Sequence, residues 1–278
     1  MKIQDKVCVI TGGGSGIGEG LAERCVREGA RHVYVADLDG DQATRVAEKV
    51  GGTGVPIDVS DETAVQALVD RVETEQGALD LFVSNAGYVT VGGVEASNEA
   101  LQKMWEVHVL SHLYAARAAL PGMIGRGGGT LLNTASAAGL LSQIGSLHYS
   151  ITKHAAIALA EWLSITHHHQ GIRVAVLCPQ AVATNIRQNS PQADAMATGP
   201  GVASGDGVLT KEDVADCVLE ALEDERFWVL PHAEVAEYAR RKGADVDRWL
   251  SGMRRFQDHL FEGAPLPGDV LVGESESD

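Results

Sequence analysis

The chain has 278 residues, of which 45% are hydrophobic, and its 38 acidic residues outnumber its 22 lysines and arginines, giving a formal net charge of −16. This length and apolar content suffice for one α/β domain with a sizeable core. The acidity argues against nucleic acid or an anionic membrane as partner, since both bind clustered cations. We attribute it to solubility.

Four cysteines, Cys8, Cys25, Cys178 and Cys217, are scattered without a C-x-x-C pair. This spacing predicts neither a disulfide framework nor a metal site and fits a reducing compartment. The first apolar run, Val7–Ile10, is too short for the core of a signal peptide, and no run approaches membrane-spanning length. We therefore expect a soluble, cytoplasmic protein with no bound metal and no membrane partner.

Short β-branched runs alternate with longer helical patterns, which is typical of βαβ units around a parallel sheet. The expected strands are Lys6–Thr11, His32–Asp37, Gly54–Asp58, Leu79–Ser84, Thr130–Thr134, Ile172–Cys178 and Arg226–Leu230. The expected helices include Gly18–Glu28, Gln42–Val50, Asp61–Gln76, Asn98–Ile124 and His148–Gln170. Because such crossovers are right-handed, we predict an α/β, doubly wound, Rossmann-like fold: a mostly seven-stranded parallel sheet, helices on both faces, in a single domain.

Two segments break this rhythm. Thr184–Leu209 has no periodicity and is rich in small and polar residues, and so long a loop is usually functional. After Arg255 there is no further lysine or arginine, and the acidic last six residues are expected to be disordered. We therefore expect a catalytic domain over residues 1–255, with a substrate loop at about 184–209, and a C-terminal extension over 256–278.

A glycine-rich turn follows the first strand. Gly12, Gly16 and Gly18 stand in a G-x-x-x-G-x-G spacing immediately before helix-compatible sequence. Glycines let the backbone approach a pyrophosphate, which then rests on the N-terminus of the helix. Taken alone, a turn of this kind could bind any phosphate or none.

The second strand ends in Asp37, nineteen residues after Gly18. A carboxylate at this place accepts hydrogen bonds from ribose hydroxyls and repels a 2′-phosphate. Asp39 adds a second negative charge, and Ser15 occupies a place where a cation would neutralise a phosphate. The alternative is that Asp37 only opens a turn. We expect NAD(H) to be preferred over NADP(H).

Tyr149 lies four residues before Lys153 and thirteen residues after Ser136. A phenol and an ammonium at this spacing share a helix face, and the ammonium is expected to lower the pKa of the phenol. A phenol that exchanges a proton near neutral pH is what alcohol–ketone interconversion requires. A Tyr-x-x-x-Lys alone occurs by chance in many helices, so the argument depends on its order after the glycine turn.

From about Lys6 to Thr184 the chain resembles the short-chain dehydrogenase/reductase family. Thr11–Gly18 matches its T-G-x-x-x-G-x-G turn, Ser84–Gly87 resembles its N-N-A-G stretch, and Pro179–Thr184 follows its P-G-x-V-x-T stretch. The resemblance implies a NAD(H) site made by Gly12, Ser15, Gly16, Ile17, Gly18, Asp37, Asp58, Val59, Asn85, Ala86, Gly87, Tyr149, Lys153, Pro179, Val182 and Thr184. It also implies that Tyr149 is the acid and base, that Ser136 holds the substrate oxygen, and that Lys153 binds the nicotinamide ribose.

Two residues depart from the family pattern. His108 stands where the family has an asparagine whose carbonyl holds a water in a proton relay. Its carbonyl could keep that relay and its imidazole could join it, or the side chain could simply pack between helices. Gln180 replaces a glycine, so the turn after the sixth strand must accept a side chain.

The expected substrate pocket is mainly apolar, which favours an uncharged, moderately hydrophobic secondary alcohol or ketone. Its expected residues are Leu140, Leu141, Gln143, Ile144, His148, Val182, Ile186 and Met196. Arg187 is the one cation placed to clamp an acid, and an isolated loop arginine is more often solvated.

Apolar and small residues surround much of the helices Asn98–Ile124 and His148–Gln170. In the resembling family this pair forms a dimer interface, so we expect a homo-oligomer, and a tetramer in particular. The main alternative function is a catalytically weak or inactive NAD(H)-binding sensor or scaffold on the same fold, which His108 and Gln180 would favour. An epimerase fits the glycine spacing less well, and a methyltransferase would not require the Ser–Tyr–Lys set.

Overall fold

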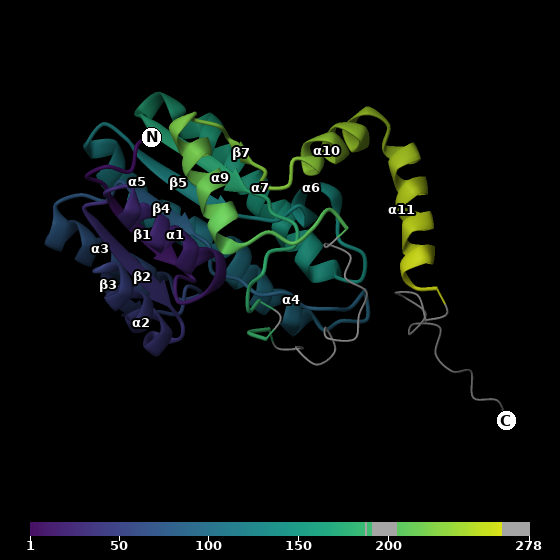
Figure 1. The fold of residues 1–278 in the computed structure, drawn as a ribbon, viewed down its shortest axis with the longest axis horizontal. Coiled ribbons are helices and arrows are strands. Elements are labelled where there is room, and N and C mark those ends of the chain that lie inside the picture. The colour runs from purple at the N-terminus through teal and green to yellow at the C-terminus, as the bar shows by residue number, and fades with distance from the viewer. Residues whose placement is uncertain (187, 191–204, 263–278) are drawn as a thin grey trace.

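The protein is described here from a computed structural model, which places residues 1–186, 188–190 and 205–262. Seven described strands form one parallel sheet in the order β3-β2-β1-β4-β5-β6-β7 (Figure 1). The strands are β1 (Val7–Thr11), β2 (His32–Asp37), β3 (Thr53–Pro56), β4 (Leu81–Ser84), β5 (Gly129–Thr134), β6 (Ile172–Leu177) and β7 (Trp228–Val229). The doubly wound, Rossmann-like parallel sheet predicted from the sequence is confirmed.

Helices cover both faces of this sheet. The described helices are α1 (Gly16–Arg27), α2 (Gly40–Val50), α3 (Glu62–Gln76), α4 (Asn98–Trp105), α5 (Ser111–Gly125), α6 (Ala138–Leu141), α7 (Leu147–His167), α9 (Lys211–Glu223), α10 (Glu234–Ala244) and α11 (Val246–Leu260). Helices α3, α5 and α7 share one hydrophobic core with the sheet, whereas α1, α2 and α9 share the other.

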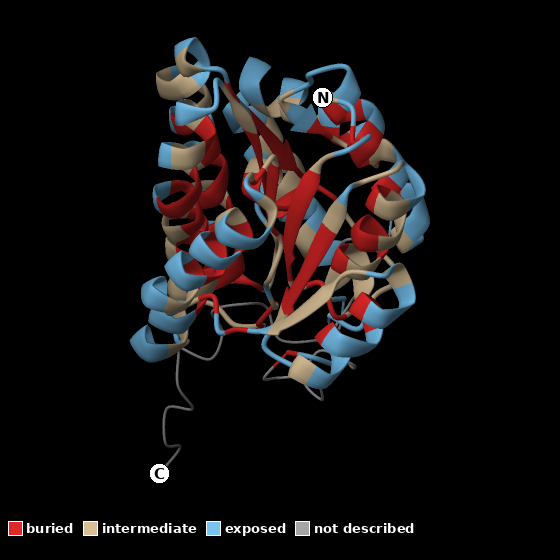
Figure 2. Cartoon of the chain, turned by 90° about the vertical axis from the view of Figure 1, so that its left-hand side faces the viewer, coloured by how far each residue is buried: buried red, intermediate tan, exposed pale blue. Residues whose placement is uncertain are grey.

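The two cores follow from the alternation of side chains along each strand. In β1, Val7 and Val9 point into the first core, and Cys8 and Ile10 point into the second. Figure 2 shows the result, since buried residues fill most of the inner strands and the helix sides that face them, whereas β3 at the edge has no buried residue. Both faces of the strands are covered, which explains their near-continuous apolar sequence.

The segment expected as one helix over Asn98–Ile124 is interrupted. A π-helical turn at Glu106–Leu110 separates α4 from α5, and His108 and Val109 are buried in it. Such turns are frequent at functional sites because they shift the side chains that follow around the helix axis. Periodicity over 27 residues did not reveal this local change.

The C-terminal part contains more regular structure than the sequence led us to expect. Helices α10 and α11 were not anticipated, and α11 continues past Arg255, where we had placed the start of an extension. The two ends of the loop at 184–209 meet, because Val182 and Leu209 form a parallel bridge. The expected disordered end, together with Arg187 and Met196, lies outside the described residues. Within the described part of the chain, no helix has the length and apolar character needed to cross a membrane.

Candidate active site

A cavity of about 2370 Å³ opens at the carboxyl ends of the strands, where ligands bind in open α/β sheets. The turns after β1, β2, β4, β5 and β6 border it, and so does α11. Among the expected site residues, it is bordered by Gly12, Ser15, Gly16, Ile17, Asp37, Asp58, Val59, Asn85, Ala86, Gly87, Ser136, Leu141, Gln143, Ile144, Tyr149, Lys153, Pro179, Val182, Thr184 and Ile186.

Four expected residues do not border this cavity. Gly18 lies behind the glycine turn, where a Cβ would collide with the carbonyl of Gly12, so its role is close packing of α1 against β1. Leu140 lies in α6 and packs against the first core, His148 is buried in α7, and neither borders the pocket to which we assigned it. His108 is fully buried behind the cavity wall.

The glycine turn fits a pyrophosphate. Gly12 and Gly16 have φ angles of 61° and 53°, a region that favours glycine, and a Cβ on Gly12 would lie 2.8 Å from Ala86 Cα. Ser15 caps α1 without a side-chain hydrogen bond, so the first N–H groups of this helix are left for a ligand. Ser15, Gly16 and Ile17 all border the cavity, and an anion at this helix start would be favoured by its dipole.

Asp37 holds the glycine turn with its own carboxylate. Its Oδ2 accepts a hydrogen bond from the Gly14 N–H at 2.9 Å, and its Oδ1 accepts one from the Asp39 N–H at 3.0 Å. Two carboxylate oxygens offer about four lone-pair sites, so acceptor capacity remains for hydroxyl groups of a ribose.

Arg45 of α2 borders the same end of the cavity, and the sequence analysis missed it. Its guanidinium donates to the Gly14 carbonyl at 3.0 Å and to Glu19 Oε1 at 3.2 Å. The sequence does contain a signal for this residue, because Arg45 is a cation on the helix that follows Asp37 at the end of β2. Three of its five N–H donors are already engaged, by Gln42, Glu19 and Gly14, so most of its donor capacity is used within the protein.

Asn85 joins three strand ends at the centre of the cavity. Its Nδ2 donates to the carbonyl of Thr11 at 3.0 Å, and its Oδ1 accepts from Thr134 Oγ1 at 3.2 Å. The Thr11 hydroxyl in turn accepts the N–H of Asn85 at 2.9 Å. These bonds fix the backbone between the glycine turn and the candidate catalytic residues Ser136, Tyr149 and Lys153.

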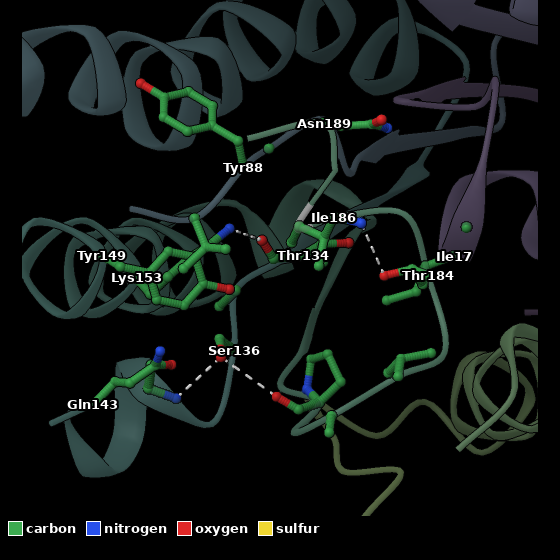
Figure 3. A pocket seen from close by; sticks show the side chains of 18 of the residues that line it. Ile17, Tyr88, Thr134, Ser136, Gln143, Tyr149, Lys153, Thr184, Ile186 and Asn189 are labelled. Carbon is green, nitrogen blue, oxygen red and sulfur yellow. Dashed lines mark hydrogen bonds between the residues drawn. The ribbon is translucent and has the colours of Figure 1, made fainter. Parts of the chain in front are cut away.

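Ser136, Tyr149 and Lys153 lie together on the cavity wall (Figure 3). Tyr149 and Lys153 come from successive turns of α7, with Lys153 Nζ 5.5 Å from the centre of the Tyr149 ring. Lys153 Nζ donates to the Thr134 carbonyl at 3.0 Å. Ser136 Oγ accepts the Ala138 N–H at 3.1 Å, which fixes it at the end of β5. The structure thus brings the three residues to one place.

Burial shifts the pKa values of Tyr149 and Lys153. Burial raises the pKa of the Tyr149 phenol above its ordinary value, although a hydrogen bond with Ser136 opposes the shift. Burial also lowers the pKa of Lys153 to about 7. We expected Lys153 to lower the phenol pKa, but in the free protein desolvation outweighs that attraction and disfavours both charged forms. An additional positive charge beside Tyr149 would lower the pKa of its phenol.

His108 has a partner for each ring nitrogen. Its Nε2 accepts a hydrogen bond from the Tyr88 N–H at 3.2 Å, and its Nδ1 lies 3.0 Å from Thr152 Oγ1. Nε2 is an acceptor, so Nδ1 carries the proton of a neutral imidazole. Burial, with Lys153 nearby, lowers the His108 pKa well below its usual range. Of our two interpretations, this geometry favours a packed, structural histidine.

His112 lies one helical turn beyond His108 and is also fully buried. Neither of its ring nitrogens has a hydrogen-bond partner, and burial lowers its pKa to about 3. It does not border the cavity. We give it no catalytic role.

Gln180 joins the turn after β6 to the C-terminal helices. Its Nε2 donates to Asp206 Oδ2 at 2.8 Å, and the Tyr238 hydroxyl donates to the other carboxylate oxygen at 3.0 Å. Its own N–H donates to His232 Nδ1 at 3.2 Å. The side chain that replaces the family glycine is therefore accommodated, and it ties the substrate loop to α10.

The chain is similar to known proteins over most of its length. The family model for the short chain dehydrogenases matches residues 6–195. The chain belongs to this family. It is 34% identical over 260 residues to a 1-deoxy-11-beta-hydroxypentalenate dehydrogenase from Streptomyces exfoliatus, with 90% of this chain and 92% of that protein covered.

Two solved structures show the same fold in complex with different dinucleotides. A short chain dehydrogenase/reductase from Burkholderia phymatum in complex with NAD has a TM-score of 0.79 and 29% identity, covering 89% of this chain and 96% of that one. An L-sorbose reductase from Gluconobacter frateurii complexed with NADPH and L-sorbose has a TM-score of 0.72 and 26% identity, covering 83% and 97%. Membership of this oxidoreductase family therefore does not by itself select NAD or NADP.

Proposed function

We propose that this protein is an NAD(H)-dependent dehydrogenase that interconverts a secondary alcohol and a ketone. The observation that carries the proposal is the position of Ser136, Tyr149 and Lys153 on the same cavity as the glycine turn. A phosphate-binding turn alone could bind many ligands, and a Tyr–Lys pair alone occurs by chance in many helices. Their meeting in one cavity combines a dinucleotide site with a proton-exchanging phenol.

The dinucleotide would lie along the carboxyl ends of the strands. The N-terminus of α1 would hold its pyrophosphate, Asp37 its adenosine ribose, and Val182 and Thr184 its nicotinamide end. We assign NAD(H) because Asp37 places a negative charge where a 2′-phosphate would stand, while Arg45 is already engaged by Glu19. When bound, the nicotinamide ring accepts or supplies the hydride.

The protein's own residues would handle the proton. Tyr149 would take the hydroxyl proton from the alcohol during oxidation and return it to the oxygen during reduction. Ser136 would hold that oxygen in place by a hydrogen bond, and Lys153 would bind the nicotinamide ribose and stabilise the phenolate. Burial raises the pKa of the free phenol, and the positive charge of the oxidised cofactor would lower it and so help to activate Tyr149.

The substrate would be uncharged and moderately hydrophobic, in accordance with Leu141, Ile144 and Ile186 at the cavity wall. We further propose a cytoplasmic homotetramer. On α7, Ile151, Trp162 and Ile165 leave 40%, 59% and 81% of their surface exposed, and such apolar side chains commonly mark a subunit contact. Light scattering at micromolar concentration tests the assembly, and a monomeric mass would contradict it.

The function is tested by incubating the purified protein with NAD⁺ and a panel of secondary alcohols while following NADH absorbance. We expect turnover of at least part of the panel, and the reverse reaction with NADH and the matching ketones. NADH binding without turnover in either direction would favour the sensor or scaffold alternative instead.

A further inference from the structure

Helix α11 forms the outer wall of the cavity at its substrate end. The helix begins after Asp245, whose side chain accepts a hydrogen bond from the Arg248 N–H at 2.9 Å. In Figure 1 it lies at the margin of the molecule, beyond α10 and apart from the helices that cover the sheet. None of its residues is buried, yet its apolar residues recur at helical spacing on one side. Such a face normally contacts something apolar.

The apolar residues of α11 fall into two groups. Trp249, Met253 and Phe256 border the cavity, whereas Leu250 does not, although it is apolar and similarly exposed. Phe261, just after the helix, also borders the cavity, and its ring reaches to 3.8 Å from where a Cβ on Gly145 would stand. The cavity-facing group therefore spans the opening between α10 and the loop that follows α6.

The cavity is large enough for two ligands. Sites for a single small molecule have volumes of roughly 300–1,000 Å³, and this cavity has about 2370 Å³. A dinucleotide in the half formed by the glycine turn leaves the half between Tyr149 and α11. The apolar side chains of that second half are Leu141, Ile144, Ile186, Trp249, Met253, Phe256 and Phe261.

The cations at this end of the cavity are already paired. Lys103 lies 3.0 Å from Glu99, and Arg241 lies 2.7 Å from Glu237. The Asp206 carboxylate also borders this end and accepts hydrogen bonds from two neighbours. An anionic substrate would thus meet the Asp206 carboxylate, and Lys153, whose Nζ donates to the Thr134 carbonyl, is the one cation among the described cavity residues without an acidic partner. An uncharged apolar substrate would instead cover exposed rings.

We propose that the substrate is an uncharged alcohol or ketone with a bulky, multi-ring apolar skeleton, and that α11 is its recognition element. Its reacting carbon would lie at Tyr149, and the rest of its skeleton would extend to Trp249, Met253 and Phe256. This inference rests on the proposed function, since Tyr149 must mark one end of the substrate. A short alcohol could reach Tyr149 but would leave the α11 face uncovered.

Binding of three ketones with one, two and four rings tests this proposal: cyclohexanone, decalone and androstanedione. Calorimetry on the NADH-loaded Tyr149→Phe variant measures each Kd without requiring turnover. We expect the Kd to tighten by at least about tenfold from cyclohexanone to the tightest larger ketone, because more apolar surface is buried. Equal affinities for the three ketones would overturn the proposal.

Phe256→Ala and Leu250→Ala, added to the same background, form a matched pair. The two side chains are 40% and 43% exposed on one helix, and only Phe256 borders the cavity. We expect Phe256→Ala to weaken the tightest ketone by at least about tenfold and Leu250→Ala by less than about twofold. Equal effects of the two substitutions on ketone binding would overturn the proposal. Phe256→Ala could instead lower the mass of the oligomer and leave ketone binding unchanged, and this result would also overturn the proposal and assign the face to a subunit contact. If the ketones bind as expected but the wild type does not turn them over, the dehydrogenase function is wrong and the proposed class of ligand is retained.

Discussion

His108 Nε2 accepts the main-chain N–H of Tyr88 at 3.2 Å, and this bond favours a structural role for the histidine over a role in proton transfer. An imidazole whose second nitrogen also faces Thr152 Oγ1 at 3.0 Å has no free position for passing on a proton. The ring instead connects the segment after β4 to α7, the helix that carries Tyr149. We therefore infer that His108 positions the site and carries no proton.

Replacing His108 separates these roles. We expect His108→Asn and His108→Leu to lower stability by about 1–3 kcal/mol, because the Tyr88 N–H loses its acceptor. Their kcat per folded protein should stay within about threefold of the wild type, with the same pH dependence. Urea unfolding and pH–rate profiles measure the two effects. A kcat loss of tenfold or more with an altered pH profile, in a protein that still binds NADH, would identify a relay residue.

The cofactor preference depends on Asp37. We expect Asp37→Asn to lower the ratio of kcat/KM for NAD⁺ over NADP⁺ by about 10–100-fold, since hydrogen bonds to a charged group contribute about 1.5–3 kcal/mol each. Arg45, held beside Gly14, would then face a phosphate without a competing acid at β2. Asp39→Asn is the control, because that neighbouring carboxylate caps α2, and it should change the ratio far less. Similar ratios in the wild type and in Asp37→Asn would refute the assignment.

Cofactor binding should change the acidity of Tyr149. Burial holds its pKa above the ordinary value of about 10 in the free protein, and NAD⁺ brings a positive charge to the site. We therefore expect the phenolate absorbance of wild type minus Tyr149→Phe to develop at lower pH when NAD⁺ is bound. Alcohol oxidation, which needs the phenolate, should accelerate as the pH rises. A phenol that already ionises near neutral pH without cofactor would contradict this account.

His112 makes stability depend on pH. Its pKa is about 3 in the folded protein and about 6.5 when unfolded, so the unfolded chain binds more protons between these values. Stability is therefore lost as the pH falls below about 6.5. When the pH is lowered from about 7.5 to about 5.5, we expect the unfolding free energy of the His112→Leu variant to fall by less than that of the wild type.

Urea unfolding at fixed protein concentration measures this difference. The same variant should be more stable than the wild type at neutral pH, because it removes two unpaired buried nitrogens. An unchanged loss on acidification would show that other groups, such as His108, dominate.

The sequence predicted the parts of this molecule that depend on local pattern. The parallel strands β1, β2, β4 and β6 could be predicted because they are buried, mainly apolar runs. Gly12, Gly16 and Gly18 were recognisable because their geometry excludes side chains. The π-helical turn at Glu106–Leu110 was missed because it shifts the helix by a fraction of a turn without breaking periodicity.

Features that arise from tertiary contact were not predictable. Arg45 reaches the cavity only because α2 packs beside the glycine turn, and the partners of His108 are 20 and 44 residues away in sequence. The effect of burial on the pKa of Tyr149 likewise depends on surroundings that no spacing reveals. The wall formed by α11 was missed because the spacing of Trp249, Met253 and Phe256 was not interpreted as one face of a helix, and the boundary at Arg255 falls inside that helix.

The most direct test of the central claim is the kcat of Tyr149→Phe for an alcohol that the wild type oxidises, measured with the Kd for NADH. The phenylalanine keeps the ring and removes the one oxygen that exchanges the proton. We predict that turnover falls by at least about a thousandfold, beyond what a single lost hydrogen bond explains, while the NADH Kd changes by less than about threefold. Substantial residual turnover would contradict the assignment of Tyr149 as the acid and base.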